Sequence, residues 1–255
     1  MRMYFESLVL QGVRIYVDAY CLRNFTTKLE RIYMSILNYT LKDALVVMAA
    51  SSHVNVHKPW FQFVELVNVV MSDTRMVKNT STVKFFECKS RLNPYRYMFM
   101  WKLFYKSEKL LFIKVDTDTI FYPYRLRVSQ NNEFIYAGSS RGTFEIPREI
   151  FQHYDVPFRL GLHYIQGGFE LVNRAAFTRA WPCLTMLENH SLLKIIPGRA
   201  KAEDLLLGLC MATQTILPIN MKTVSPWRVD FPRCKQFVSV HSIKTNYDMT
   251  WRRCK

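Results

Sequence analysis

The chain has 255 residues, 49% of them hydrophobic, which suits one large domain or two small ones and argues against a globally disordered protein. Its formal net charge of +15 at pH 7 favours an anionic partner: nucleic acid, a membrane surface or a phosphorylated small molecule. The sequence has no zinc-finger spacing and no aromatic-rich RNA-binding segment, so nucleic-acid binding rests on charge alone. No segment reaches the apolar length of a membrane span, and charges at Arg2, Glu6, Arg14 and Asp18 argue against an ordinary signal peptide.

The first half of the chain alternates between strand-like and helix-like patterns. Strands are predicted over 13–20, 44–52, 81–89 and 110–116, and helical spacing of apolar residues is found over 26–44, 60–71 and 93–109. Asn93 and Pro94 are typical of a helix start and predict a helix of about 14 residues. The alternation predicts an α/β fold with a doubly wound, mostly parallel sheet.

Two carboxylates follow the last of these strands. Asp116-Thr117-Asp118 comes directly after the apolar run 110–113, and apolar Ile120 and Phe121 follow at once. Ligands bind parallel sheets beyond the carboxyl ends of their strands, which is where this pair is predicted to lie. Buried carboxylates need a partner or a metal, and oxygen ligands suit Mg²⁺ or Mn²⁺. The sequence therefore indicates either a solvated strand tip or a cation site.

Three further patterns in the second half each have an ordinary structural explanation beside a functional one. Gly167-Gly168 precedes an apolar stretch and a helix predicted to begin near Asn173, so it is either a simple turn or a close backbone approach to a ligand. Glu203-Asp204 opens an apolar helix, where acidic residues are generally favoured. His241 lies among alternating apolar residues of a predicted short strand, over 236–243, as either a core histidine or a ligand.

The order of these motifs resembles the β-1,3-glycosyltransferase family of fringe and the core 1 galactosyltransferase. The Asp-x-Asp motif of that family is similar to "KVDTDTIFYP", and its glycine motif is similar to "QGGFELVNRAA". Its Glu-Asp motif resembles "EDLLLGLC" at 203–210, and its late histidine resembles "SVH" at 239–241. The resemblance covers residues 44–250 and implies a GT-A fold, the nucleotide-diphospho-sugar transferase architecture.

The resemblance also implies roles for individual residues. Asp118 and His241 would hold Mn²⁺ or Mg²⁺, and Asp204 would be the general base that takes a proton from the acceptor hydroxyl. The donor, a UDP-sugar, would be bound by Asp116, which contacts its ribose or sugar, together with Gly167, Gly168 and Glu203. These roles imply an inverting enzyme that transfers a hexose or N-acetylhexosamine to a glycan or glycoprotein hydroxyl, in β-1,3 linkage.

Domain boundaries and compartment follow from the same resemblance. Residues 1–43 have no counterpart in the family and are expected to be a stem-like or accessory segment, and 44–255 to be a single catalytic domain. The family resides in the Golgi or ER lumen behind a membrane anchor, which we expect to lie outside these residues. Four Asn-x-Ser/Thr sequons, more than the roughly one or two expected by chance, favour a secretory route. They are Asn24, Asn38, Asn79 and Asn189.

Cysteine usage leaves two possibilities open. The six cysteines form no CxxC pair, which argues against a zinc site. Their even number permits disulfides, and a set of buried free thiols fits the sequence equally well.

Two alternatives to an active glycosyltransferase remain. The segment around Trp60 lacks the Arg residues usual near the nucleotide in this family, which favours a catalytically degenerate relative that binds a glycan or a partner protein. A basic nucleic-acid-binding domain is the other, although we expect no nucleic-acid partner.

Overall fold

The computed structural model describes residues 6–10, 13–17, 38–50, 58–71, 74, 77–88, 93–129, 132–144, 162–189, 203–225 and 236–241. The chain divides into two compact units, one of residues 1–38 and 127–131 and one of 39–126 and 132–255. In the smaller unit, β1 pairs antiparallel with β2, and β2 confirms the strand predicted from residue 13. Its strands are β1 (Glu6–Leu10), β2 (Val13–Val17) and β9 (Val128–Ser129).

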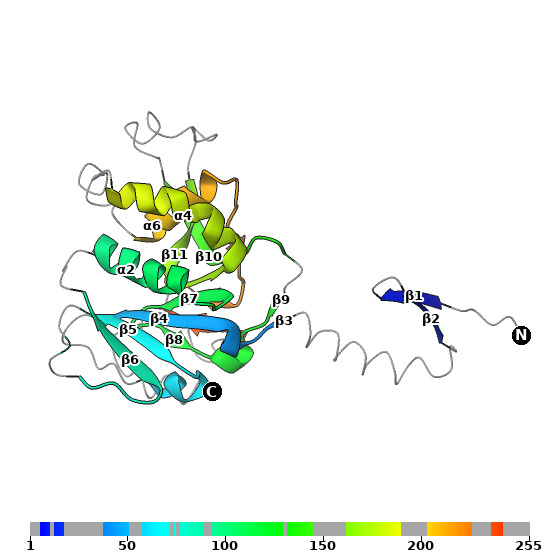
Figure 1. Ribbon diagram of the computed structural model, residues 1–255, viewed down its shortest axis with the longest axis horizontal. Helices are drawn as coiled ribbons and strands as arrows, with labels where there is room; N and C mark the ends of the chain where they lie inside the picture. The colour runs from blue at the N-terminus through cyan, green and yellow to red at the C-terminus, as the bar shows by residue number, and fades with distance from the viewer. Residues whose placement is uncertain are drawn as a thin grey trace, which may run out of the picture. The chain divides into compact units, whose positions relative to one another are not determined.

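A mixed, mostly parallel sheet organises the larger unit, which is therefore α/β (Figure 1). Its strand order is β12-β10-β11-β7-β4-β5-β6, and only the two pairings made by β11 are antiparallel. The strands are β4 (Ala44–Ala50), β5 (Val67–Met71), β6 (Val83–Glu87), β7 (Leu111–Val115), β10 (Tyr136–Phe144), β11 (Leu162–Asn173) and β12 (Ile219–Asn220). The predicted strands over 44–52, 81–89 and 110–116 are confirmed.

Three helices pack on one face of this sheet and bury its core (Figure 1). They are α2 (Asn93–Lys106), α4 (Arg174–Asn189) and α6 (Glu203–Ala212). Tyr97, Trp101 and Phe104 follow helical spacing along α2 and are at most 4% exposed. Phe112 of β7 and Val172 of β11 belong to the same buried cluster, so every second residue along these strands faces the helices.

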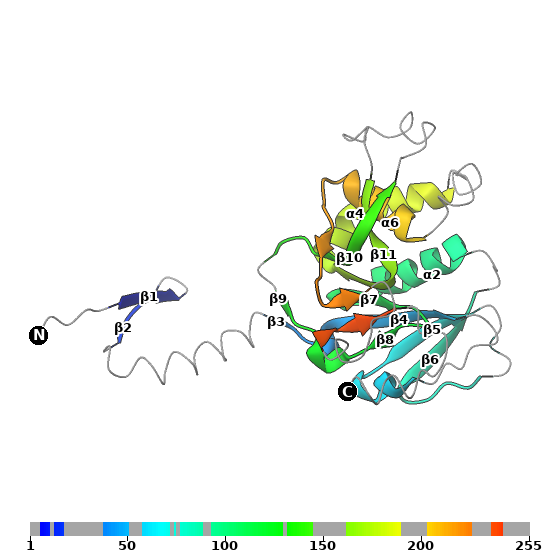
Figure 2. The same cartoon turned by 180° about the vertical axis from the view of Figure 1, so that it is seen from behind.

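A small three-stranded sheet and short 3₁₀ turns cover the other face (Figure 2). The ring of Phe121 links the two layers, with its centroid 5.4 Å from Trp60 and 5.3 Å from Phe169 of β11. The elements of this layer are β8 (Ile120–Phe121), β13 (Val224–Ser225), β14 (Ser239–Val240), η2 (Pro59–Phe63) and η3 (Pro123–Arg125).

The helix predicted over 60–71 is wrong, because η2 ends at Phe63 and β5 occupies Val67–Met71. Three valines in β5 are β-branched and lose side-chain freedom in a helix, whereas β5 is buried along its whole length between β4 and β6. The helical pattern over 26–44 is also wrong where the structure describes it. Residues 38–44 hold β3 (Asn38–Tyr39), η1 (Leu41–Asp43) and the start of β4, and 26–37 lie outside the described residues.

The helix starts predicted at Asn93 and near Asn173 are confirmed. α2 begins at Asn93 and runs for 14 residues. α4 begins directly after Asn173, whose side-chain oxygen accepts the backbone N–H of Ala176 at 3.0 Å and so caps the helix.

Among the described residues, no helix is long and apolar enough to cross a membrane.

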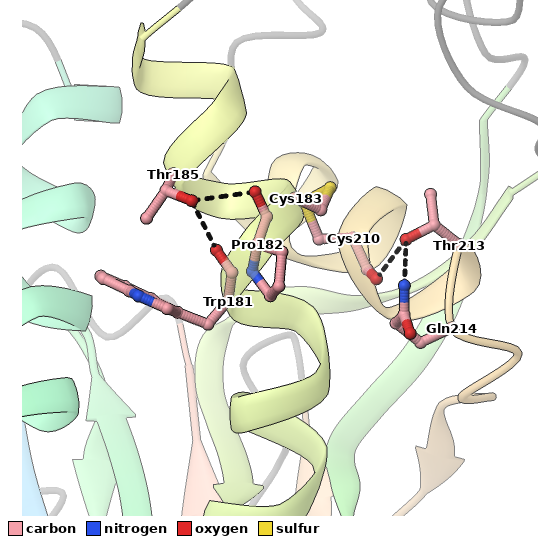
Figure 3. The surroundings of a disulfide bond; sticks show 7 residues. All are labelled: Trp181, Pro182, Cys183, Thr185, Cys210, Thr213 and Gln214. Atoms are coloured by element: carbon pink, nitrogen blue, oxygen red, sulfur yellow. Dashed lines mark hydrogen bonds between the residues drawn. A yellow bond between two sulfur atoms is a disulfide. The ribbon is translucent and has the colours of Figure 1, made fainter.

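A disulfide between Cys183 and Cys210 joins α4 to α6 (Figure 3). Both cysteines are buried, and 27 residues separate them in sequence. Closing a loop of that length in the unfolded chain stabilises the folded state by about 3.5 kcal/mol in the chain-entropy description. The open question about the cysteines is thus answered for three of them, since Cys88 is a free thiol and Cys21, Cys234 and Cys254 lie outside the described residues.

Arg174 ties the start of α4 to the end of α2, and we expect Arg174→Lys to lower the free energy of unfolding by about 2 kcal/mol. Its guanidinium donates to the carbonyls of Ser107 and Lys109 at 2.7 and 2.6 Å and lies 3.9 Å from the centre of the Phe104 ring. A lysine ammonium cannot make this forked set of contacts. Denaturant unfolding should show the loss, and Arg179→Lys on the same helix should cost much less, because Arg179 is exposed. Equal losses in the two variants would contradict this role.

Candidate metal centre

The turn after β7 carries both aspartates of the Asp-x-Asp motif. The backbone N–H of Thr119 donates to the carbonyl of Asp116 at 3.0 Å, which closes a tight turn between β7 and β8. The N–H of Asp116 donates to the carbonyl of Gly168 on β11 at 3.1 Å, and the Thr119 hydroxyl donates to the same carbonyl at 3.0 Å. The predicted position of the two aspartates at the carboxyl end of β7 is confirmed.

Strand pairing brings His241 to this turn from a segment more than 120 residues away in sequence. β14 pairs antiparallel with β8, with Val240 opposite Ile120, so the next residue along β14 lies beside the residue before β8. The N–H of His241 donates to the carbonyl of Ser225 at 3.0 Å, which fixes its backbone. His241 therefore follows a short strand, as predicted, and its side chain turns toward the aspartates.

Asp116, Asp118 and His241 together form a candidate metal centre. One ligand atom from each lies within 4.8 Å of the others, and all three side chains are partly exposed. The Nε2 of His241 is 3.1 Å from Asp118 Oδ1 and 3.7 Å from Asp116 Oδ2. Neighbouring ligands of an octahedral cation are about 3 Å apart when each is about 2.1 Å from the ion, so these separations fit one small divalent cation. The two carboxylate oxygens suit Mn²⁺ or Mg²⁺, whereas the imidazole nitrogen favours a transition metal, so of these two cations Mn²⁺ fits the set better.

The side chain of Asp116 is held from its inner side. Lys114 Nζ is 3.1 Å from Asp116 Oδ1, and the Tyr97 hydroxyl of α2 is 3.5 Å from the same oxygen. Oδ2 is the oxygen that faces His241. One oxygen of this carboxylate thus faces the Lys114 ammonium and the other faces the His241 imidazole. Sequence reasoning had assigned Asp116 to the donor rather than to the ligand cluster.

Gly168 makes room for the imidazole. A Cβ built on Gly168 would lie 2.5 Å from both Cβ and Cγ of His241, closer than side-chain atoms pack. The sequence had suggested a close backbone approach to a ligand, and here the approach is to the imidazole of His241. Gly167 precedes it within β11.

Asp204 lies on α6 and is not one of the three clustered residues. It is half-buried in the first turn of the helix, and its Oδ1 accepts the N–H of Leu205 at 3.0 Å. Burial and then the charge of Asp204 raise the pKa of the Tyr164 phenol on β11. The predicted start of this helix is confirmed, and Glu203 is its first residue.

The interior behind Asp116 contains two more charges that sequence reasoning did not assign to the site. Lys114 and Glu170 are both fully buried, and they lie opposite one another in the ladder between β7 and β11. Burial and then the charge of Glu170 raise the pKa of the Tyr136 phenol, to which Asp204 also contributes, whereas Lys114 lowers it. The alternation of β7 would have shown that Lys114 faces the helices, but its register with Glu170 is not readable from sequence.

We expect Gly168→Ala to weaken Mn²⁺ binding by roughly 10- to 100-fold, the range seen when groups that orient metal ligands are changed. The added methyl group would displace the imidazole, and so move Nε2 away from Asp118. Titration calorimetry with Mn²⁺ measures the loss. Gly208→Ala is the matched control, because its Cβ would meet Tyr164 at 2.6 Å and strain the packing of α6 without touching His241. Equal Mn²⁺ affinity in Gly168→Ala and the wild type would contradict the assignment of His241.

Comparison with known proteins finds no family model that matches the chain and no curated protein that matches it. The geometry of the site itself therefore has to carry the functional argument.

Proposed function

We propose that this protein is a metal-dependent, inverting glycosyltransferase of the GT-A type. It transfers a hexose or N-acetylhexosamine from a UDP-sugar to a hydroxyl of a glycan or glycoprotein, in β-1,3 linkage. The resemblance to the fringe and core 1 galactosyltransferase family suggested this reaction, and the single observation that carries it is the meeting of Asp116, Asp118 and His241 at one point.

The position of the triad supports a nucleotide-sugar site. It follows the carboxyl end of β7, between β4 and β11, where α/β sheets bind their ligands. A divalent cation bound there supplies charge neutralisation for a departing nucleoside diphosphate. The formal net charge of +15 further favours an anionic substrate.

Each residue then has a task. Asp118 and His241 hold the cation, Asp116 offers Oδ2 toward the same point, and Gly168 leaves space for the imidazole. The main chain at Gly167 and the first residue of α6, Glu203, belong to the donor side of the site.

Asp204 is the general base in this proposal. A carboxylate in the first turn of a helix is kept ionised by the helix dipole and can take the proton of the attacking acceptor hydroxyl. The hydroxyl oxygen then forms its bond to the anomeric carbon as the bond to UDP breaks, which inverts that carbon in one displacement.

The compartment we propose is the Golgi or ER lumen. The Cys183–Cys210 disulfide and the four sequons support an oxidising, glycosylating compartment. Asn79 is a candidate for a glycan, because its side chain is exposed in the loop before β6.

Titration calorimetry with UDP, with and without Mn²⁺, tests the function. We expect UDP to bind only when Mn²⁺ is present and EDTA to abolish the binding. Weak or metal-independent UDP binding would favour a degenerate glycan-binding or partner-binding relative. Salt-sensitive RNA binding without UDP binding would overturn the proposal in favour of a nucleic-acid-binding domain. A donor screen with sugar release as the readout then identifies the sugar.

A further inference from the structure

Lys114 is a buried cation in direct contact with a residue of the candidate metal centre. Its side chain is 0% exposed, and Nζ lies 3.1 Å from Asp116 Oδ1 and 4.8 Å from the centre of the Tyr97 ring. A buried charge is costly unless opposite charge compensates it. Lys114 and a bound cation would therefore compete for the charge of the same carboxylate.

A second carboxylate lies on the other side of Lys114. Glu170 of β11 is directly opposite Lys114 of β7 in the antiparallel ladder, and directly opposite residues have Cβ atoms about 5 Å apart on the same face of a sheet. Glu170 is 0% exposed, and both of its carboxylate oxygens are buried. Since Phe112 and Val172 on these two strands belong to the helix-side core, Lys114 and Glu170, two residues away, face the same interior.

We propose that Glu170 is a positioning residue of the metal centre: it balances the charge of Lys114, so that Asp116 can be oriented by Lys114 and still offer its negative charge to a divalent cation. This inference rests on one part of the proposed function, the binding of a divalent cation by Asp116, Asp118 and His241. Without Glu170, the buried Lys114 ammonium depends more on the carboxylate of Asp116 for compensating charge. With it, Oδ1 of Asp116 is held by Lys114 while Oδ2 stays available on the His241 side.

The response of Tyr136 agrees with this arrangement. Burial is the main cause that raises the pKa of its phenol, and the charges of Glu170, which raises it, and Lys114, which lowers it, both reach that phenol. Both charges lie on the helix-covered face, whereas the Asp-Thr-Asp turn continues from the end of the same strand. Lys114 and Glu170 thus lie in the protein interior behind the metal centre.

The test is a set of variants titrated with Mn²⁺ alone and followed by thermal unfolding without metal. Glu170→Gln keeps the shape and removes the charge, and we expect it to lower Mn²⁺ affinity by roughly tenfold. Adding Lys114→Met to it removes both buried charges and should restore the affinity to within about threefold of wild type, since neighbouring charges are strongly coupled. Glu188→Gln is the matched control, because Glu188 pairs with Lys102 between α2 and α4 and should leave Mn²⁺ affinity unchanged.

Thermal unfolding without metal shows how much each variant changes the stability of the fold, apart from its effect on Mn²⁺ affinity. Glu170→Gln removes a buried negative charge beside the Lys114 ammonium and should unfold about 5 °C or more below the wild type, whereas the double variant should lie closer to it. If Glu170→Gln does not fold, the double variant carries the test, and a double variant that folds without binding Mn²⁺ would overturn the proposal. A Glu170→Gln variant that folds and binds Mn²⁺ with wild-type affinity would also overturn the positioning role of Glu170. That result would not contradict the assignment of Asp116, Asp118 and His241 as the metal centre. A wild-type protein that binds no Mn²⁺ overturns both the metal centre and this inference.

Discussion

Asp118→Asn should abolish Mn²⁺-dependent UDP binding, with Mn²⁺ affinity reduced by more than about 100-fold, beyond the loss seen for groups that only orient metal ligands. Asp118 Oδ1 lies 3.1 Å from His241 Nε2, closer than Asp116 Oδ2 at 3.7 Å. An amide keeps the shape of the side chain and loses its negative charge. Titration with Mn²⁺ and then with UDP should show both affinities falling together.

Asp43→Asn is the control for this variant. Asp43 precedes the amino end of β4, which is parallel to β7, so it lies at the opposite edge of the sheet from the triad. Its carboxylate accepts hydrogen bonds from Thr40 within the cap of η1. Asp43→Asn should bind Mn²⁺ and UDP as the wild type does. If Asp118→Asn also keeps wild-type Mn²⁺ affinity, the triad is not the metal centre.

Asp204→Asn should lower turnover by roughly 10² to 10⁴ while leaving UDP affinity nearly unchanged. An amide cannot take the proton of the acceptor hydroxyl, but it can still accept the N–H of Leu205, as Asp204 Oδ1 does at 3.0 Å. The helix start is therefore preserved and the base is lost. Steady-state turnover and a UDP titration on the same preparation measure the two quantities.

Comparing Asp204→Asn with Asp118→Asn distinguishes the general base from the metal ligand. Both Asp→Asn variants should look inactive in a turnover assay, but only Asp118→Asn should lose UDP. If Asp204→Asn keeps more than about a tenth of the turnover, Asp204 is only a capping residue of α6 and the proposed mechanism is wrong.

Local patterns predicted the elements that lie next to the site. The strand before Asp116, the helix start at Asn93 and the acidic start of α6 are each decided within a few residues, and all three are confirmed. The prediction for segment 60–71 failed because its short apolar runs, such as Val69 to Met71, fit a buried strand as well as a helix. Only the neighbouring strands β4 and β6 decide between the two.

The residues of the site are brought together by pairing between strands that are far apart in sequence, and local sequence patterns do not reveal such pairing. His241 reaches Asp118 through the ladder of β14 with β8, and Gly168 reaches His241 through the ladder of β11 with β7. The antiparallel strands β10 and β11 were not predicted at all, so neither the contact of Gly168 with the imidazole nor the register of Lys114 with Glu170 was foreseen. The family resemblance suggested the ligand pair, but it gave Asp116 no place beside it.

The most direct test of the metal centre is an anomalous-difference map at the manganese absorption edge, from crystals grown with Mn²⁺ and UDP. We predict one strong peak roughly 2.1–2.4 Å from Asp118 and His241, with Asp116 Oδ2 as a third ligand and the UDP phosphates in the remaining positions. A map with UDP bound and no peak between these three side chains would contradict the account.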